Sequence, residues 1–340
     1  MPRSAVGIAS KVIRRTVATS LAARFGRFRS WPDERLLLSE PLAMAEERTS
    51  RLRRIYANSL RDAWDGPTLF REAMTRHGGI QLEAEKRAHL SYPISMLMWG
   101  ELAAWIVSAE LAERLEDPDA RMAASSQVFD EARHFYTLRD YLAALHVPVP
   151  KLDTYFAIAA RRLLMAKDLD LKLFAMQILA EGTAQAIFRF LADAKIEPVL
   201  TDLLPYIERD EARHVGLGVL HLPERLAKRT PAQCRRLASH VGAIGDLFGA
   251  TQIRYVEHYR AIGAEPRELF RSADKMLHEI SHKLGNIPGT DEPYFRTANT
   301  ADPAYDRHLS VVVPPPGAPL GRVARAVRAL VDFGARALPA

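Results

Sequence analysis

Apolar residues recur along most of the chain at the three- and four-residue spacing of amphipathic helices, and sustained two-residue alternation bounded by turns is nearly absent. From Pro41 to about Arg76 the pattern is helical, is interrupted at Gly66-Pro67, and ends at Gly78-Gly79. This periodicity predicts an all-α chain. The further helices that it predicts span about 81–89, 93–115, 120–145, 153–166, 169–194, 198–223, 231–262 and 266–284.

Proline and acidic residues mark the ends of these segments. Pro93 is expected to begin the long apolar helix, because the missing N–H of a proline is harmless in a first turn. Asp117-Pro118-Asp119 is the expected turn after it, and the prolines at 148 and 150 close the next helix. The region 93–223 therefore holds two helical pairs joined by a crossover at 153–166. This is the plan of a ferritin-like four-helix bundle, here with additional N- and C-terminal helices.

Two identical pentapeptides lie in this region, at Asp130–His134 and at Asp210–His214. Each contains a Glu and a His three residues apart, so both side chains lie on one helical face and can reach one point. A further Glu precedes each copy by 30 residues, Glu101 before the first and Glu181 before the second. All matched positions are therefore offset by the same 80 residues.

A dinuclear carboxylate site takes one Glu from each of two helices and a Glu-x-x-His pair from each of the other two. Glu101 and Glu181 both lie in strongly apolar segments, where a buried carboxylate needs a partner or a metal. Oxygen ligands with some imidazole nitrogen suit iron or manganese. We therefore expect two iron ions, or a manganese and an iron, on Glu101, Glu131, His134, Glu181, Glu211 and His214.

These motifs resemble those of the ferritin-like di-iron carboxylate proteins over about residues 90–225. The Asp-Glu-x-Arg-His form is similar to that of bacterial multicomponent monooxygenases and soluble acyl carrier protein desaturases, and related forms occur in the ribonucleotide reductase small subunit and in di-iron N-oxygenases. The resemblance implies that Asp130 orients His214 and that Asp210 orients His134. Arg133 and Arg213 would then neutralise the two aspartates.

The sequence departs from each subgroup at one position. Leu138 stands where the reductase subunit has its radical Tyr, Gln185 where the multicomponent monooxygenases have a Thr, and Ile207 where the N-oxygenases have a further His. The subgroup therefore stays open.

The expected function is O2 activation by an oxidase or oxygenase, such as a monooxygenase, that acts on a small organic or lipid-like substrate. The chain extends well beyond the bundle, which favours an enzyme with a substrate pocket, and the alternative is a ferritin-like metal-oxidising or storage protein. Aromatic residues near the motifs could line such a pocket or belong to the core: Trp99, Trp105, Phe129, Phe135, Phe174 and Phe188. Electrons would come from a partner such as a reductase or ferredoxin, and a homodimer is expected by analogy.

A rival motif lies at residues 278–282, which read His-Glu-Ile-Ser-His, the zinc-peptidase pattern. The third His of metzincins is missing, because Pro288 stands at its position, and Glu292 is the nearest replacement. A helix with two His four residues apart also arises readily by chance. The peptidase is therefore the weaker alternative.

The net charge of +6 is concentrated at the ends: residues 1–32 carry +7 and residues 317–340 carry +3, which leaves the body at −4. An acidic body argues against nucleic-acid binding. Cys234 is the single cysteine, so an internal disulfide is excluded. A cytoplasmic location is expected.

Four regions are expected: a basic tail or amphipathic helix at 1–40, the ferritin-like domain at 41–285, an irregular Pro/Gly-rich linker at 286–319, and a basic amphipathic helix at 320–340. The basic ends are candidates for contact with a membrane surface or a protein partner, and residues 1–31 also fit an organelle-targeting segment.

Overall fold

A computed structural model of the chain describes residues 47–317, 325–326 and 329–332. The compact unit that begins at Glu47 is helical, and its described residues form no strand. The all-α prediction is therefore confirmed, whereas the segment predicted at 1–40 lies outside the described residues. The helices are α3 (Glu47–Arg61), α4 (Gly66–His77), α5 (Ala84–Arg114), α6 (Pro118–Ala144), α7 (Thr154–Met165), α8 (Leu169–Phe174), the π-helix η1 (Ala175–Ala180), α9 (Glu181–Asp193), α10 (Pro198–Leu226), α11 (Pro231–Ala261), α12 (Pro266–Leu284) and α13 (Tyr305–Val312).

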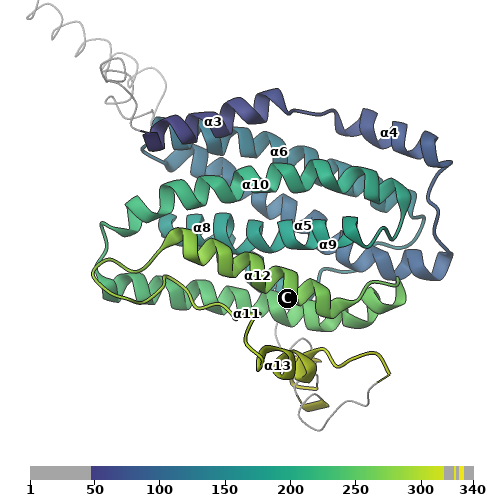
Figure 1. Cartoon of the computed structure of the whole chain (residues 1–340). Helices are drawn as coiled ribbons and strands as arrows, with labels where there is room; N and C mark the ends of the chain where they lie inside the picture. Colours follow the sequence, from purple (N-terminus) through teal and green to yellow (C-terminus); the bar gives the residue numbers. More distant parts are fainter. Residues whose placement is uncertain (1–46, 318–324, 327–328, 333–340) are drawn as a thin grey trace, which may run out of the picture. The chain divides into compact units, whose positions relative to one another are not determined.

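Four helical rods form the bundle that the sequence predicts. Helix α5 packs along α6, and α9 packs along α10, while α8, η1 and α9 follow one another directly as one rod. Helix α7 is the crossover between the two pairs. Helices α3 and α4 cover the bundle on α6 and α10, and α11 and α12 cover it on α5 and α9 (Figure 1). The ferritin-like arrangement is therefore confirmed.

Local chemistry explains where these helices begin. Asp117 accepts hydrogen bonds from the backbone N–H groups of Asp119 (2.9 Å) and Ala120 (3.1 Å), so it caps α6. Glu197 caps α10 through the N–H of Leu200 at 2.8 Å. At the other end of a helix, Gly78 terminates α4 with a φ of 68°, the left-handed conformation that favours glycine.

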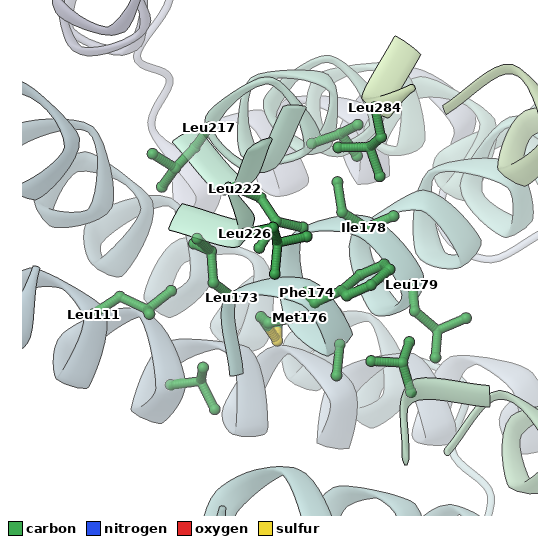
Figure 2. Close-up of a cluster of buried hydrophobic side chains, with 14 of the residues drawn as sticks. Leu111, Leu173, Phe174, Met176, Ile178, Leu179, Leu217, Leu222, Leu226 and Leu284 are labelled. Atoms are coloured by element: carbon green, nitrogen blue, oxygen red, sulfur yellow. The ribbon is translucent and has the colours of Figure 1, made fainter. Parts of the chain in front are cut away.

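Two apolar clusters fill the bundle, one toward each end. One cluster contains Phe174 from α8 and Leu222 from α10. Figure 2 shows its side chains converging from α5, α8, η1, α10 and α12. The other contains Ile94, Leu138 and Leu203 from α5, α6 and α10. On each rod the residues between these clusters are the motif residues. The predicted site is thus a polar layer enclosed by two apolar cores, which keeps bulk water away from it.

Three helix predictions need correction. The expected break at 90–92 does not exist, since α5 runs without interruption from 84 to 114 and Pro93 lies inside it. Buried neighbours such as Leu90 and Ile94 pack on both sides of the proline, and this packing outweighs the lost backbone hydrogen bond. Helix α13 lies inside the segment predicted to be irregular at 286–319.

The third correction concerns the rod that carries Glu181. The sequence predicts one α-helix over 169–194, but its central turn, Ala175–Ala180, is a π-helix. Such single-turn insertions occur often at functional sites. The helix predicted at 320–340 lies mostly outside the described residues.

By length and composition, α5 is the one helix in the described part of the chain that could cross a membrane, and 56% of its most apolar window is buried inside the structure. Glu101 lies within this helix and faces other carboxylates. The apolar residues of α5 are therefore explained by packing inside the bundle.

Candidate metal centre

The bundle brings all six predicted ligand residues together in its polar layer. Glu101 comes from α5, Glu131 and His134 from α6, Glu181 from the first residue of α9, and Glu211 with His214 from α10. None is more than 4% exposed. Their oxygen and nitrogen atoms form two overlapping groups of four residues, and within each group these atoms lie within 4.8 Å of one another.

The first half-site, as we call Glu101 and His134 with the shared carboxylates, is centred on the Nδ1 atom of His134. This nitrogen lies 3.1 Å from Glu211 Oε1, 3.4 Å from Glu101 Oε2 and 3.6 Å from Glu131 Oε2. One imidazole and three carboxylates thus point at one position.

The second half-site, Glu181 and His214 with the same shared carboxylates, repeats this arrangement. His214 Nδ1 lies 3.0 Å from Glu211 Oε2, 3.1 Å from Glu131 Oε1 and 3.7 Å from Glu181 Oε2. Glu131 and Glu211 therefore turn one oxygen toward each half-site, as carboxylates that bridge two metal ions do.

Buried polar atoms without hydrogen bonds show that the first half-site fits a metal ion. Glu131 Oε2, His134 Nδ1 and Glu211 Oε1 are fully buried and lack hydrogen-bond geometry to any described residue, although they lie within ion-pair distance of one another. A buried polar atom without a partner costs about 1–3 kcal/mol. All three point into the first half-site, where a cation would satisfy them together. The role of the six residues as metal ligands stays a prediction.

The outer nitrogens of the two histidines face aspartates of the opposite repeat. His134 Nε2 lies 3.2 Å from Asp210 Oδ2, and His214 Nε2 lies 3.4 Å from Asp130 Oδ2, which are the pairs that the resemblance implied. A carboxylate at this position selects the tautomer in which Nδ1 is free to bind metal, and it raises the basicity of that nitrogen.

Two buried arginines close this outer ring, which we call the Arg–Asp square. Arg133 Nη2 donates to Asp130 at 2.6 Å and to Asp210 at 2.7 Å. Arg213 Nη2 donates to Asp210 at 2.6 Å and to Asp130 at 3.0 Å. Each arginine thus joins the aspartate of its own motif to that of the other copy, so the square is a buried, balanced network rather than a set of surface pairs.

Two opposing effects act on the pKa of each imidazole: burial lowers it, and the neighbouring carboxylates raise it. Burial alone would lower the pKa of His134, but its hydrogen bond to Asp210 and the nearby carboxylates of Glu101, Glu131 and Glu211 outweigh burial and hold that pKa well above the usual value. The pKa of His214 is likewise raised, because the charges of Glu131 and Glu211 outweigh burial. Burial would raise the pKa of Asp210, but the hydrogen bond and charge of His134 dominate and lower it.

The four glutamates divide into two pairs. Burial and the charge of Glu211 raise the pKa values of Glu101 and Glu181 well above the ordinary value. Burial also acts on Glu131 and Glu211, but the charge of His214 and hydrogen bonds to the imidazoles leave both pKa values lowered. Without metal, protonation is therefore favoured at the terminal glutamates, Glu101 and Glu181, over the shared pair.

Sequence reasoning missed the side chains that support this layer. Trp64 donates its Nε1–H to Asp210 Oδ2 at 2.8 Å and stacks on His134 with ring centroids 6.1 Å apart. Ser59 donates to Asp130 Oδ2 at 3.2 Å. Gln127 donates to Glu131 and Glu181, and Gln177 donates to Gln127. Each occurs once, outside the repeated pentapeptides, so no spacing marked it.

An apolar cavity of about 70 Å³ adjoins the centre, with Glu101 and Glu181 in its wall. Phe156 and Phe248 line it, whereas none of the aromatic residues suggested from the sequence does, since Phe174 and Phe188 are fully buried in the apolar cores and Phe129 is exposed. A groove of about 610 Å³ beside α11 and α12 shares Thr183, Phe248 and Gln252 with this cavity. The cavity and the groove are therefore neighbours that have these three residues in common.

The rival zinc motif lies on α12, away from these six residues. His278 and His282 approach each other with their Nε2 atoms 3.1 Å apart, and His278 Nδ1 lies 2.8 Å from Thr297 Oγ1. Glu292 pairs with Arg235 at 3.3 Å. Among the described residues, no group of three potential ligands includes this histidine pair.

Comparisons with known proteins agree with this fold. No family model matches the chain, and no curated protein matches it. Three solved variants of an R2-like ligand-binding oxidase with a Mn/Fe cofactor do match. All three are 16% identical to this chain. The first two have a TM-score of 0.51: one match covers 71% of this chain and 99% of the oxidase, and the other covers 68% of this chain and 92% of the oxidase. The third has a TM-score of 0.50 and covers 75% of this chain and 96% of the oxidase. The chain therefore has the ferritin-like helical fold of these oxidases.

Proposed function

We propose that this protein is an O2-activating oxidoreductase that holds a pair of iron ions, or a manganese and an iron, and oxidises a small organic or lipid-like substrate. The observation that carries the proposal is the pair of shared carboxylates, Glu131 and Glu211, each with one oxygen toward His134 and the other toward His214. The Mn/Fe cofactor of the structurally similar oxidases supports this choice of metals.

The residues of the centre have different roles in this proposal. The four glutamates balance the charge of two divalent ions, and His134 and His214 complete the ligand set while leaving coordination positions open. When bound, such a pair supplies the electrons that reduce O2. Asp130 and Asp210 hold the imidazoles in the metal-binding tautomer. Electrons for further turnovers would come from a reductase or ferredoxin.

The cavity favours a substrate-oxidising enzyme over a metal-storage protein. Its wall includes both terminal glutamates and is otherwise mostly apolar, with residues such as Met96, Leu163 and Ile187. Beyond these two glutamates the wall offers few oxygen ligands to incoming iron ions, whereas its apolar residues can take up the hydrocarbon part of a substrate.

Metal analysis of the purified chain tests the proposal. We expect about two iron or manganese ions per chain and loss of both in a variant that combines Glu131→Gln with Glu211→Gln, checked for folding by circular dichroism. His278→Ala is the control and should keep both ions. One zinc ion per chain that survives in the double variant but is lost with His278→Ala would contradict the di-iron function.

Oxygen consumption separates the two ferritin-like functions. An oxidase loaded with its metals consumes O2 in proportion to added reductant and substrate, with a constant metal content. A storage protein instead consumes O2 in proportion to added Fe²⁺ and accumulates many irons per chain.

A further inference from the structure

We propose that the two half-sites are inequivalent, because Gln127 is a positioning residue that fixes Glu181 and leaves Glu101 as the carboxylate free to move. This inference rests on the proposed metal-binding function. It concerns which half-site is preorganised, and therefore the order in which the two ions bind.

Gln127 uses its whole amide group inside the centre. Its Nε2 donates to Glu131 Oε1 at 2.8 Å and to Glu181 Oε1 at 2.7 Å. Its Oε1 accepts a hydrogen bond from Gln177 Nε2 at 2.7 Å. Because an amide has two N–H donors, both are used on the two carboxylates, and the bond from Gln177 fixes which end of the amide faces them.

Gln177 is itself held firmly, since it lies in η1 and is completely buried. Its Cβ packs so closely on Gly218 of α10 that a Cβ added at that glycine would lie 2.6 Å away. Gln177 is therefore packed between the π-helical turn and the glycine of α10. The chain from Gln177 through Gln127 to Glu181 is therefore built from residues with little freedom to move.

The described residues form no equivalent chain in the first half-site. Gln127 precedes Glu131 by four residues, and the corresponding position before Glu211 is Ile207. Gln177 stands in the same relation to Glu181, and the corresponding position before Glu101 is Leu97. Among the described residues, no side-chain amide donates to Glu101. The 80-residue symmetry of the ligands is thus broken in the residues behind them.

This difference has a direct chemical consequence. Gln127 occupies Glu181 Oε1, so the other oxygen, 3.7 Å from His214 Nδ1, is the one presented to a metal. Among the described residues, no amide donates to either oxygen of Glu101, although both Glu101 and Glu181 adjoin the cavity. A change in carboxylate binding when a substrate or O2 arrives is therefore expected at Glu101.

Preorganisation also sets the order of loading. A ligand set that is already oriented binds without the entropy cost of ordering. The first ion should therefore bind in the second half-site, and the second ion should bind more weakly beside Glu101.

Titration of the metal-free full-length chain with Co²⁺, followed by calorimetry and visible absorption, tests this order. The wild type should bind two ions in two resolved steps. Glu181→Gln should remove the tight step, and Glu101→Gln the weak one. Gln127→Leu should weaken the tight step about 10- to 100-fold, the usual effect of losing an outer partner of a ligand, so that the two steps merge.

Two further variants keep the test decisive. Gln177→Leu leaves the donor in place but releases its orientation, so it should weaken the tight step in the same direction by a smaller factor; it also replaces Gln127→Leu if that variant does not fold. Gln185→Leu is the matched control, a buried glutamine of α9 four residues after Glu181, and should leave both steps unchanged. If the wild type binds no Co²⁺, the proposed function fails. If it binds two ions and Gln127→Leu and Gln177→Leu leave the steps resolved, or Gln185→Leu merges them equally, only the role of Gln127 is refuted.

Discussion

Removing the metal pair should make the stability of the chain depend steeply on pH. In the metal-free protein the pKa values of Glu101, Glu181, His134 and His214 are all raised, so we expect these four groups to hold protons in the folded site. Two imidazolium charges then balance the two shared carboxylates. Two divalent ions replace the four protons, so the centre is electrically neutral in both states.

The sign of the pH effect follows from these pKa directions. A group whose pKa is raised on folding stabilises the fold fully below its unfolded value, 4.5 for Glu and 6.5 for His, and loses that contribution as the pH rises through the folded value. His258, with its pKa lowered to about 4, acts in the opposite sense below 6.5. The interpretable window therefore begins at pH 6.5 and extends upward.

The magnitude follows from the number of protons. Each proton held only by the folded state changes the free energy of unfolding by about 1.4 kcal/mol per pH unit. Four such groups give an upper limit of about 5 kcal/mol per pH unit above pH 6.5 in the metal-free chain, and almost none in the metal-loaded one.

Urea unfolding of the chelator-treated and metal-loaded chains between pH 6.5 and 8.5 measures this difference. Calorimetric Co²⁺ titrations in buffers of different ionisation enthalpy count the protons released, and we expect about four per pair of ions. A metal-free chain that is as stable at pH 8.5 as at 6.5, or release of fewer than about one proton, would refute this account of the buried charges.

Three substitutions test other parts of the structure. Asp210→Asn should weaken Co²⁺ binding in the half-site of His134 about 10- to 100-fold, measured by titration, since the imidazole loses its anionic partner; unchanged affinity would contradict that role. Gly218→Ala should lower the free energy of unfolding by about 1–3 kcal/mol in urea, because the new methyl group overlaps the π-helix. Gly242→Ala, with open space around it, is its control and should be neutral or stabilising. Ala184→Phe, in the cavity wall, should abolish coupled O2 consumption while metal content stays at the wild-type value; full turnover would exclude the cavity as the substrate site.

The main features of the fold could be predicted because local signals agree with the tertiary structure. The helical period, the acidic caps such as Asp117, and Gly78 at a helix end each depend on a few neighbouring residues. The 80-residue offset placed the six ligand candidates on four rods, and the bundle then brought them together. A repeated pattern in the sequence thus corresponds to a layer of the structure.

The errors arose where packing overrides local preference. Pro93 marks a helix start in isolation, but buried neighbours carry α5 past it. The π-helical turn packs closely on α10 through Gln177 and Gly218, two residues that are far apart in the sequence. The hydrogen bond from Gln127 to Glu181 likewise joins residues that are 54 positions apart in the sequence. Contacts of this kind have no period, so they become visible only when the helices are assembled.

The Arg–Asp square also bears on how the chain folds. Its two arginines are 6% and 9% exposed, and each bonds an aspartate about 80 positions away along the chain, at separations of 77 and 83 residues. A half-bundle would leave the bonds to the other copy unmade, so the full network forms only when both helical pairs are assembled. The two helical pairs should therefore fold as one cooperative unit, and a chain cut in the loop 145–153 should yield fragments that are unfolded alone and become helical only when mixed.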